Sequence, residues 1–140
     1  MKKILLIIFL FSITYISYSQ ELKDDSGFLR GYIDTNGVVT NKKKKIVGYF
    51  PKENGTIQDG NHVVLGYLKN DTIFDINNKP AGLIYIDKIT NRREKIKGSN
   101  HELLGYIRQD GTVVDAKNAL IGTYDKSIRW QWVVIYYFFF

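Results

Sequence analysis

Short apolar runs separated by polar, turn-forming residues recur along the chain from about residue 27 onward. In one clear copy, Leu103 to Ile107 is an apolar run that ends at Gln109-Asp110-Gly111, and Thr112 to Val114 returns. Apolar runs of this length that end at Asp-Gly or Asn-Gly predict strands joined by tight turns. No part of the repeat region sustains the 3.6-residue period of a helix, so the pattern predicts a structure that is nearly all β.

The runs fall into units that each open with a glycine. Five units span residues 31–47, 48–65, 66–81, 82–104 and 105–121, and a truncated sixth opens the C-terminal segment 122–140. A unit copied at this spacing predicts one supersecondary structure repeated several times. Because a lone hairpin is barely stable in water, the five hairpins are expected to pack together around a shared axis, and closure into a ring would protect their edges.

Alternation along these strands predicts an inner and an outer face. The inner face should carry a glycine between two apolar residues. These triplets are Leu29-Gly31-Ile33, Ile46-Gly48-Phe50, Val64-Gly66-Leu68, Pro80-Gly82-Ile84, Leu103-Gly105-Ile107 and Leu120-Gly122-Tyr124. Since glycine has no side chain, a backbone or an aromatic ring can approach it closely, so these glycines are predicted to be structural repeat positions. On the return strands the expected core residues are Ile57, Ile73, Ile89 and Val113.

The fourth unit departs most from this pattern. It lacks the turn glycine, turns at Ile86-Asp87 instead, and contains an insertion from about Asn91 to Asn100.

The first 19 residues have the pattern of a secretory signal peptide. Lys2 and Lys3 precede an unbroken apolar run, Ile4 to Phe11, and Ser17-Tyr18-Ser19 is a small-residue cleavage context. The alternative is a retained membrane anchor, but the apolar stretch is shorter than the ~20 residues of a spanning helix. We therefore expect an exported protein, periplasmic, outer-membrane-associated or secreted. Residues 20–26 would form a flexible lead, and residues 27–140 would form a single domain.

Composition narrows the chemistry of this exported domain. The chain has no cysteine, so disulfides and thiol chemistry are excluded. Without the first 19 residues, 18 basic and 14 acidic residues remain, which gives 18 − 14 = +4 at neutral pH. Because no disulfide can form, hydrophobic burial and hydrogen bonds must hold the fold together.

The C-terminal segment from Trp130 to Phe140 is apolar on every side. Its aromatic and β-branched content suits a strand, while apolar character all round also suits a short buried helix. We expect it to pack at or near the centre of the ring. Contact with a membrane is the alternative, although large exposed apolar patches are rare in soluble monomers.

The repeated Gly-Tyr-Ile, Asp-Gly-Thr-Val and Leu-Ile-Gly phrases, together with the aromatic tail, resemble the 5-fold β-flower protein family. The resemblance covers about residues 27–140. It implies a small exported repeat protein of Bacteroides-type bacteria, in which five β-hairpins surround a pseudo-five-fold axis. It implies no activity and brings no functional residues with it. Unit four and Thr123, where Tyr is expected, depart from the pattern.

Several residues invite a catalytic or metal-binding interpretation. His62 and His101 each precede a unit-opening glycine by four residues, the register held elsewhere by Lys44, Asn78 and Asn118. They are therefore interpreted as turn residues that a ring keeps apart, and no metal is expected. Asp59, Asp75 and Asp115, with Asn41 and Asn91 as counterparts, recur once per unit, which favours turn formation over acid–base chemistry. No nucleophile–base pattern, phosphate loop or nucleotide fingerprint is present, so no cofactor is expected.

Basic and aromatic residues leave binding open. Lys42 to Lys45 form one cluster, and a second comprises Arg92, Arg93, Lys95 and Lys97. Such clusters can contact anionic lipid, glycan or nucleic acid, but they more often only solvate a surface, and export argues against nucleic acid. A candidate binding surface is the exposed tyrosine face, formed by Tyr32, Tyr49, Tyr67 and Tyr106.

Taken together, the sequence favours a non-enzymatic structural or interaction module of the periplasm or cell envelope, with an envelope protein or a glycan as its partner. Two alternatives remain. One is a module that binds a glycan or envelope polymer through the tyrosines and the basic loops. The other is a membrane-associated component that contacts lipid through its aromatic C-terminus.

Overall fold

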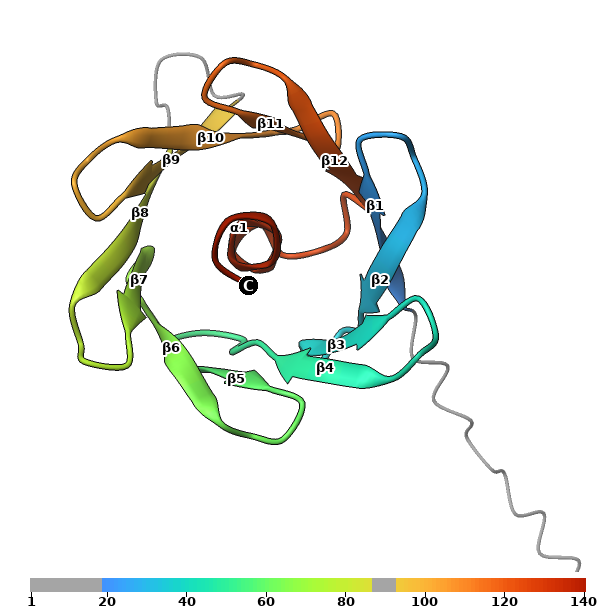
Figure 1. Ribbon diagram of the computed structural model, residues 1–140, viewed down its shortest axis with the longest axis horizontal. Coiled ribbons are helices and arrows are strands. Elements are labelled where there is room, and N and C mark those ends of the chain that lie inside the picture. Colours follow the sequence, from blue (N-terminus) through green and yellow to red (C-terminus); the bar gives the residue numbers. More distant parts are fainter. Residues whose placement is uncertain (1–18, 87–92) are drawn as a thin grey trace, which may run out of the picture.

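The computed structural model describes residues 19–86 and 93–140, which form a closed antiparallel β-barrel around a short C-terminal helix (Figure 1). Each strand pairs with its neighbours in sequence, and β12 pairs with β1 to close the ring. The strands are β1 (Gln20–Asp24), β2 (Leu29–Ile33), β3 (Val38–Asn41), β4 (Ile46–Tyr49), β5 (Gly55–Asp59), β6 (Val64–Lys69), β7 (Thr72–Asp75), β8 (Pro80–Ile86), β9 (Arg93–Gly98), β10 (Leu103–Arg108), β11 (Thr112–Asp115) and β12 (Leu120–Tyr124). The nearly all-β prediction is confirmed.

The five repeat units supply β2 to β11 as consecutive pairs, and β12 opens the truncated sixth. This last unit is completed from the other end of the chain, by β1. The flexible lead expected over residues 20–26 is therefore wrong. Leu22 lies opposite both Gly31 and Tyr124 and is completely buried. Hydrogen bonding on both sides holds this strand in the barrel and removes the two open edges that the sheet would have without it.

The fourth unit has a return strand that the sequence pattern placed too early. β9 begins at Arg93, and Ile96 pairs with Ile84 and is fully buried. Ile96 therefore fills the core position that was assigned to Ile89. Ile89 and Asn91 lie outside the described residues, and the extra length falls before β9, not within residues 93–100.

A β-bulge before each repeat glycine changes which side chain points inward. The residue directly before the glycine has no partner in the register: Val39 pairs with Gly48, and Thr40 pairs with Ile46, so Val47 is skipped. At the bulge, two residues of the glycine strand lie opposite one residue of the neighbouring strand. The strict alternation of inward and outward side chains therefore fails at this point. The predicted inward position of Ile46, Leu120 and Pro80 is wrong, because Ile46 and Leu120 are 42% and 41% exposed and Pro80 is exposed as well. The residues at the bulge that pack against the core instead are Val47, Leu104 and Ile121.

Beyond the glycine, the predicted inner face is correct. Each unit places one apolar residue from its glycine strand and one from its return strand in a common core. These pairs are Ile33 with Val39, Phe50 with Ile57, Leu68 with Ile73, Ile84 with Ile96, and Ile107 with Val113, and Tyr124 with Leu22 completes the set. All of them except the half-buried Tyr124 are at most 7% exposed. Fully burying one such side chain contributes roughly 1.5–3 kcal/mol, so this ring of pairs is a main source of stability.

The C-terminal segment is a helix at the centre of the ring (Figure 1). It begins as α1 (Trp130–Val134) and continues as a π-helical turn, η1 (Ile135–Phe139). The consecutive residues Trp132, Val133, Val134 and Ile135 are buried on all sides of the helix. The central packing predicted for this segment is confirmed, and of the two conformations that suit its composition, the helix is the one adopted. Within the described residues, no helix combines the length and apolar character that crossing a membrane requires.

The turns that precede the glycine strands project at the periphery of the ring (Figure 1). We call them the peripheral turns; they comprise residues 24–28, 41–45, 59–63, 75–79, 98–102 and 115–119. In each, the first residue accepts a backbone hydrogen bond from the fourth, which has a positive φ. In five of them, the first residue's Asp or Asn Oδ1 also accepts from the third and fifth backbone N–H groups. The turn-forming role predicted for Asp59, Asp75 and Asp115 is thereby confirmed.

Candidate functional site

The centre of the barrel is built from aromatic rings that meet the repeat glycines. A Cβ atom placed on Gly48 would lie 2.5 Å from Cζ of Phe140, and one placed on Gly105 would lie 2.9 Å from the Phe138 ring. At Gly82 the nearest atoms all belong to the Phe139 ring. A side chain at these positions would displace the ring, so the glycines leave space that the tail fills.

Successive rings of the tail meet the units in the reverse of their order along the chain. Gly122 faces Tyr137, and Gly31 lies beside the Tyr136 hydroxyl. Going round the barrel from β12 through β10 and β8 to β4, the glycines therefore meet Tyr137, Phe138, Phe139 and Phe140 in turn. Five consecutive residues span about one π-helical turn, so successive rings point toward successive parts of the surrounding barrel wall. Gly66 is the exception: the three atoms nearest to a Cβ placed on it all belong to the backbone of β7, and none belongs to a tail ring.

The two tyrosines of the tail also make polar contacts. The Tyr137 hydroxyl lies 2.6 Å from the carbonyl oxygen of Lys23 and 2.7 Å from that of Thr123, so it links the helix to β1 and β12. The Arg30 guanidinium lies over both rings, 5.5 Å from the centroid of Tyr136 and 5.8 Å from that of Tyr137. Burial raises the pKa of both hydroxyls above the ordinary value, although the positive charge of Arg30 opposes this effect.

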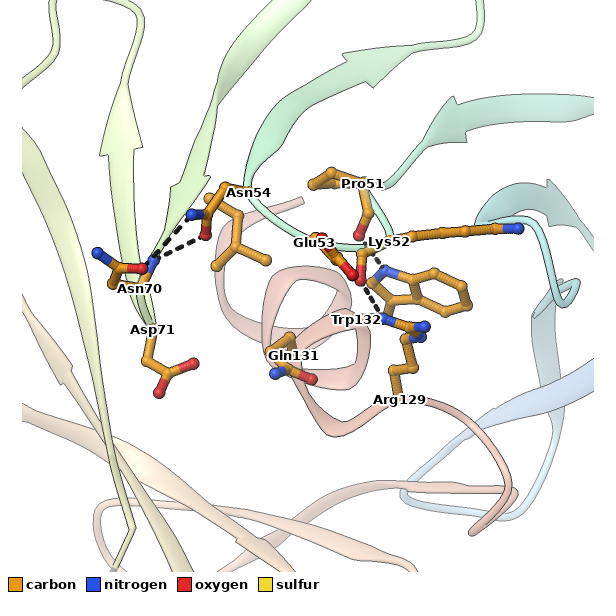
Figure 2. A pocket seen from close by; sticks show the side chains of 10 residues that line it. Pro51, Lys52, Glu53, Asn54, Asn70, Asp71, Arg129, Gln131 and Trp132 are labelled. Atoms are coloured by element: carbon orange, nitrogen blue, oxygen red, sulfur yellow. Dashed lines mark hydrogen bonds between the residues drawn. The ribbon is translucent and has the colours of Figure 1, made fainter.

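A polar hollow of about 380 Å³ lies beside the start of the central helix (Figure 2). Trp132 Nε1 donates to the Pro51 carbonyl oxygen at 2.7 Å, and Arg129 donates to that of Lys52. Across the hollow, the Asn54 side chain accepts a hydrogen bond from the backbone N–H of Asn70 at 3.0 Å. The first two contacts fix the start of the helix against the β4–β5 turn, and the third joins that turn to the β6–β7 turn.

The remaining lining of this hollow is polar but contains little that could react. Figure 2 shows Glu53, Asp71 and Gln131 around the opening. Glu53 is exposed on its turn, so water solvates its carboxylate. Trp132 is only 2% exposed and presents no ring surface to a ligand. The arrangement is best understood as the anchor of the helix.

The four predicted tyrosines are half-buried on the outer wall, where each pairs with neighbouring strands. Lys44 Nζ lies 4.8 Å from the Tyr32 ring centroid. The His62 ring stacks on Tyr49 with centroids 4.2 Å apart, and its Nδ1 lies 3.1 Å from Oε1 of Gln58. Residues of the peripheral turns thus fold back over the tyrosines. The structure does not gather Tyr32, Tyr49, Tyr67 and Tyr106 into one patch; they lie on β2, β4, β6 and β10.

One aromatic residue was missed by the sequence pattern. Tyr85 is 42% exposed on the outer face of β8, where it pairs with Lys95, and Lys95 also pairs with Tyr106 of β10. Lys97 Nζ lies 5.1 Å from the Tyr85 ring centroid. These residues form a row of aromatic and cationic side chains across β8, β9 and β10, which we call the β8–β10 row. Alternation from Gly82 already places Tyr85 outside, but this tyrosine does not belong to the repeated Gly-Tyr phrase.

The histidines are turn residues, as predicted. His62 and His101 have φ angles of 64° and 61°, and they lie in the β5–β6 and β9–β10 turns. Their register equivalents Lys44, Asn78 and Asn118 have positive φ angles too. Within residues 19–86 and 93–140, no three His, Asp or Glu side chains converge in a way that could hold a metal ion.

The two basic segments lie in different places. Lys42 to Lys45 form the peripheral turn between β3 and β4, whereas Lys95 and Lys97 lie on β9, and Arg92 falls outside the described residues. The β3–β4 turn begins with Asn41, which makes the same two Oδ1 contacts as an Asp without adding a negative charge.

Comparison with known proteins identifies the architecture. The model of the family described as 5-fold beta-flower protein matches residues 19–140. No curated protein and no solved structure matches the chain significantly. The match covers both the strand β1 that closes the barrel and the central aromatic helix. The chain therefore belongs to the 5-fold beta-flower protein family.

Proposed function

We propose that this protein is a non-enzymatic interaction module of the bacterial cell envelope or periplasm. The observation that supports this proposal is the filled axis. Trp132 to Ile135 are buried there, and the rings of Tyr136 to Phe140 meet the inner wall. Since the chain's own tail occupies the position where a barrel would hold a small ligand, binding is expected on the outer wall and the peripheral turns. Export is part of the proposal and rests on the pattern of residues 1–19.

A second candidate is binding of a glycan or envelope polymer. It is favoured by the β8–β10 row, where Tyr85, Lys95 and Tyr106 lie in register across three strands. Aromatic faces stack on sugar rings, and the two lysines add positive charge. Lipid contact through the aromatic tail receives less support, because most of that segment packs inside the barrel and only Phe140 reaches 43% exposure.

Co-sedimentation of the full chain with purified envelope polysaccharide tests both forms of the proposal. We expect binding to the wild type and a loss of at least about three-fold in affinity for Tyr85→Ala. Tyr67→Ala, on a strand outside the β8–β10 row, serves as the control and should change binding little. Turnover of a hydrolase substrate that is abolished by a single polar substitution would contradict the non-enzymatic proposal.

A further inference from the structure

The repeat provides an internal comparison, because a residue that differs from its equivalents in the other units is not required by the fold. Arg30 is such a residue. It occupies the bulge before Gly31, where Leu22 pairs with Gly31 and Lys23 pairs with Leu29. At the equivalent bulges the other glycine strands carry apolar residues, namely Val47, Leu65, Ala81, Leu104 and Ile121. Only this bulge among the described strands carries a charge.

A second departure lies on the adjacent unit. Residues 42–45 are all lysine, and the turn begins with Asn41 in place of a carboxylate. At the third position of the peripheral turns, Asn61, Asn77 and Asn100 are equivalent to Lys43, and Lys117 is the other lysine there; the run of four lysines occurs in the β3–β4 turn alone among the described turns. The turn geometry is the same in all of them, so folding does not require the lysines.

These two departures face the same hollow. A cavity of about 670 Å³ between the β1–β2 and β3–β4 turns is lined by Arg30, Asn41, Lys42, Lys43 and Tyr136, and also by Asp24, Phe28 and Leu29. Its volume lies in the range of ligand pockets, about 300–1,000 Å³. Two features that the repeat does not explain therefore converge on one place.

The charge of this hollow is unbalanced. Its one carboxylate, Asp24, accepts the backbone N–H groups of Ser26 and Phe28, both at 2.9 Å. Arg30, Lys42 and Lys43 form no ion pair with any residue that the structure describes. The guanidinium of Arg30 lies over the two tail tyrosines, whose ring faces attract its charge in the absence of a counter-ion.

The hollow also has apolar and neutral polar surface. Phe28 is 72% exposed at its edge, where an aromatic side chain has no partner in the core. Asn41 and Tyr136 both line the hollow, and neither the Asn41 side-chain nitrogen nor the Tyr136 hydroxyl makes a hydrogen bond to the described residues. Three cations, two neutral polar groups and one exposed ring together suit a ligand that carries carboxylate, hydroxyl groups and a ring face.

We infer that the hollow between the first two peripheral turns binds an acidic saccharide. The carboxylate lies between Arg30 and the lysines, the hydroxyl groups meet Asn41 and Tyr136, and a sugar ring covers Phe28. The inference rests on the proposed interaction function, and it names the site and the class of ligand. It is separate from the β8–β10 row, which lies on other strands.

Titration calorimetry of the full chain with a galacturonate tetrasaccharide tests the inference. We expect saturable binding that weakens as salt is raised, because exposed charges are screened. The neutral glucose tetrasaccharide should bind at least about ten-fold more weakly. Vesicles that contain phosphatidylglycerol provide the other anionic source. Binding to these vesicles without binding to the acidic saccharide would overturn the inference.

The substitutions for this test are taken from the residues at equivalent positions in other units. Arg30→Val installs the residue of the equivalent bulge at Val47, and we expect it to weaken binding at least about ten-fold. Lys43→Asn installs the residue found at Asn61 and Asn77, with an expected loss of about three- to ten-fold. Lys117→Asn makes the same change at the same turn position on another unit, and should leave affinity within about two-fold.

Each outcome decides the question. If circular dichroism shows that Arg30→Val is unfolded, the site is tested by comparing the binding of Lys43→Asn with that of Lys117→Asn. Equal losses for these two variants would overturn the site, because charge alone would then explain the binding. No binding of the acidic tetrasaccharide at millimolar concentration would also overturn it. Polysaccharide capture that is lost in Tyr85→Ala would in that case still support the proposed function.

Discussion

At the scale of single residues, glycine and aromatic rings act as pairs. Gly82 is the clearest pair, since the three atoms nearest to a Cβ placed on it all belong to Phe139. Gly66, in the equivalent position on β6, meets only backbone atoms of β7. The sequence predicted that something would approach these glycines closely. It did not predict which ring, because that assignment depends on the rotation of a helix that the pattern did not resolve.

The first prediction concerns this pairing. Gly82→Ala should destabilise the protein by roughly 1–3 kcal/mol, because the new methyl group overlaps the Phe139 ring. In a Phe139→Ala background at least half of that cost should disappear, a coupling of about 1 kcal/mol. The measurement is urea unfolding of the four proteins in the cycle. Gly66→Ala is the control, and its cost should be the same with and without Phe139→Ala; equal coupling at both glycines would refute the pairing.

The second prediction concerns the two buried tyrosines. Their pKa values are raised in the folded state above the ordinary 10.0, so the unfolded chain loses these protons first as pH rises. The stability they contribute is present below pH 10 and is lost as pH rises above it. The fall in unfolding free energy from pH 9 to pH 11 should therefore be smaller in Tyr136→Phe/Tyr137→Phe than in the wild type. Identical slopes would show that neither hydroxyl is protected by burial.

At the scale of elements, the peripheral turns share one hydrogen-bond pattern, and in one of them the accepting side chain comes from a different position of the turn. The β9–β10 turn begins with Gly98, which has no carboxylate. Glu102, at the other end of the turn, places its carboxylate beside Gly98 and accepts the backbone N–H of Asn100 at 2.9 Å. A carboxylate therefore reaches the same N–H group from the opposite side of the turn.

This exchange yields the third prediction. Glu102→Ala should lower stability by about 1 kcal/mol, since a backbone N–H loses a charged acceptor that water replaces only in part. Gly98→Asp in the same protein should restore most of that loss by rebuilding the pattern of the other turns. Thermal unfolding gives both values. If Gly98→Asp is as harmful in the Glu102→Ala background as in the wild type, the two carboxylates do not substitute for each other.

Element by element, the sequence was informative where local pattern decides structure. The hairpins, the turn role of Asp59 and the inner position of Ile107 follow from alternation and turn chemistry. The bulge was not predictable in the same way, because inserting one residue changes the face of everything before it and leaves no distinct residue type as a signal. Strand β9 was misplaced for a related reason: with no turn glycine, nothing local marked the start of the return strand.

At the scale of the molecule, the two ends of the described chain complete the fold. β1 closes the barrel, and the C-terminal helix fills it. Neither role was predicted fully from sequence. β1 reads Gln-Glu-Leu-Lys-Asp, with a single apolar residue, so it resembles a linker until the ring shows that it has two neighbours. The tail was predicted to be central, but uniform apolar character does not separate helix from strand.

The fourth prediction tests closure. Leu22→Ala should destabilise the barrel by roughly 2–5 kcal/mol, as expected for a completely buried leucine, even though it lies near the N-terminal end of the described chain. Lys23→Ala, one residue away, removes only an exposed ion pair with Glu21 and should stay within about 0.5 kcal/mol. Chemical unfolding distinguishes the two variants. Equal, small effects would mean that residues 20–24 are a dispensable lead.

The central helix, and the order in which its rings meet the units, organise the whole barrel. Nuclear Overhauser contacts between selectively labelled tail rings and glycine Hα protons test this arrangement directly. We predict contacts from Tyr137 to Gly122, Phe138 to Gly105, Phe139 to Gly82 and Phe140 to Gly48, with none to Gly66. Tail resonances at random-coil positions without contacts to these glycines, or contacts in a different order, would contradict it.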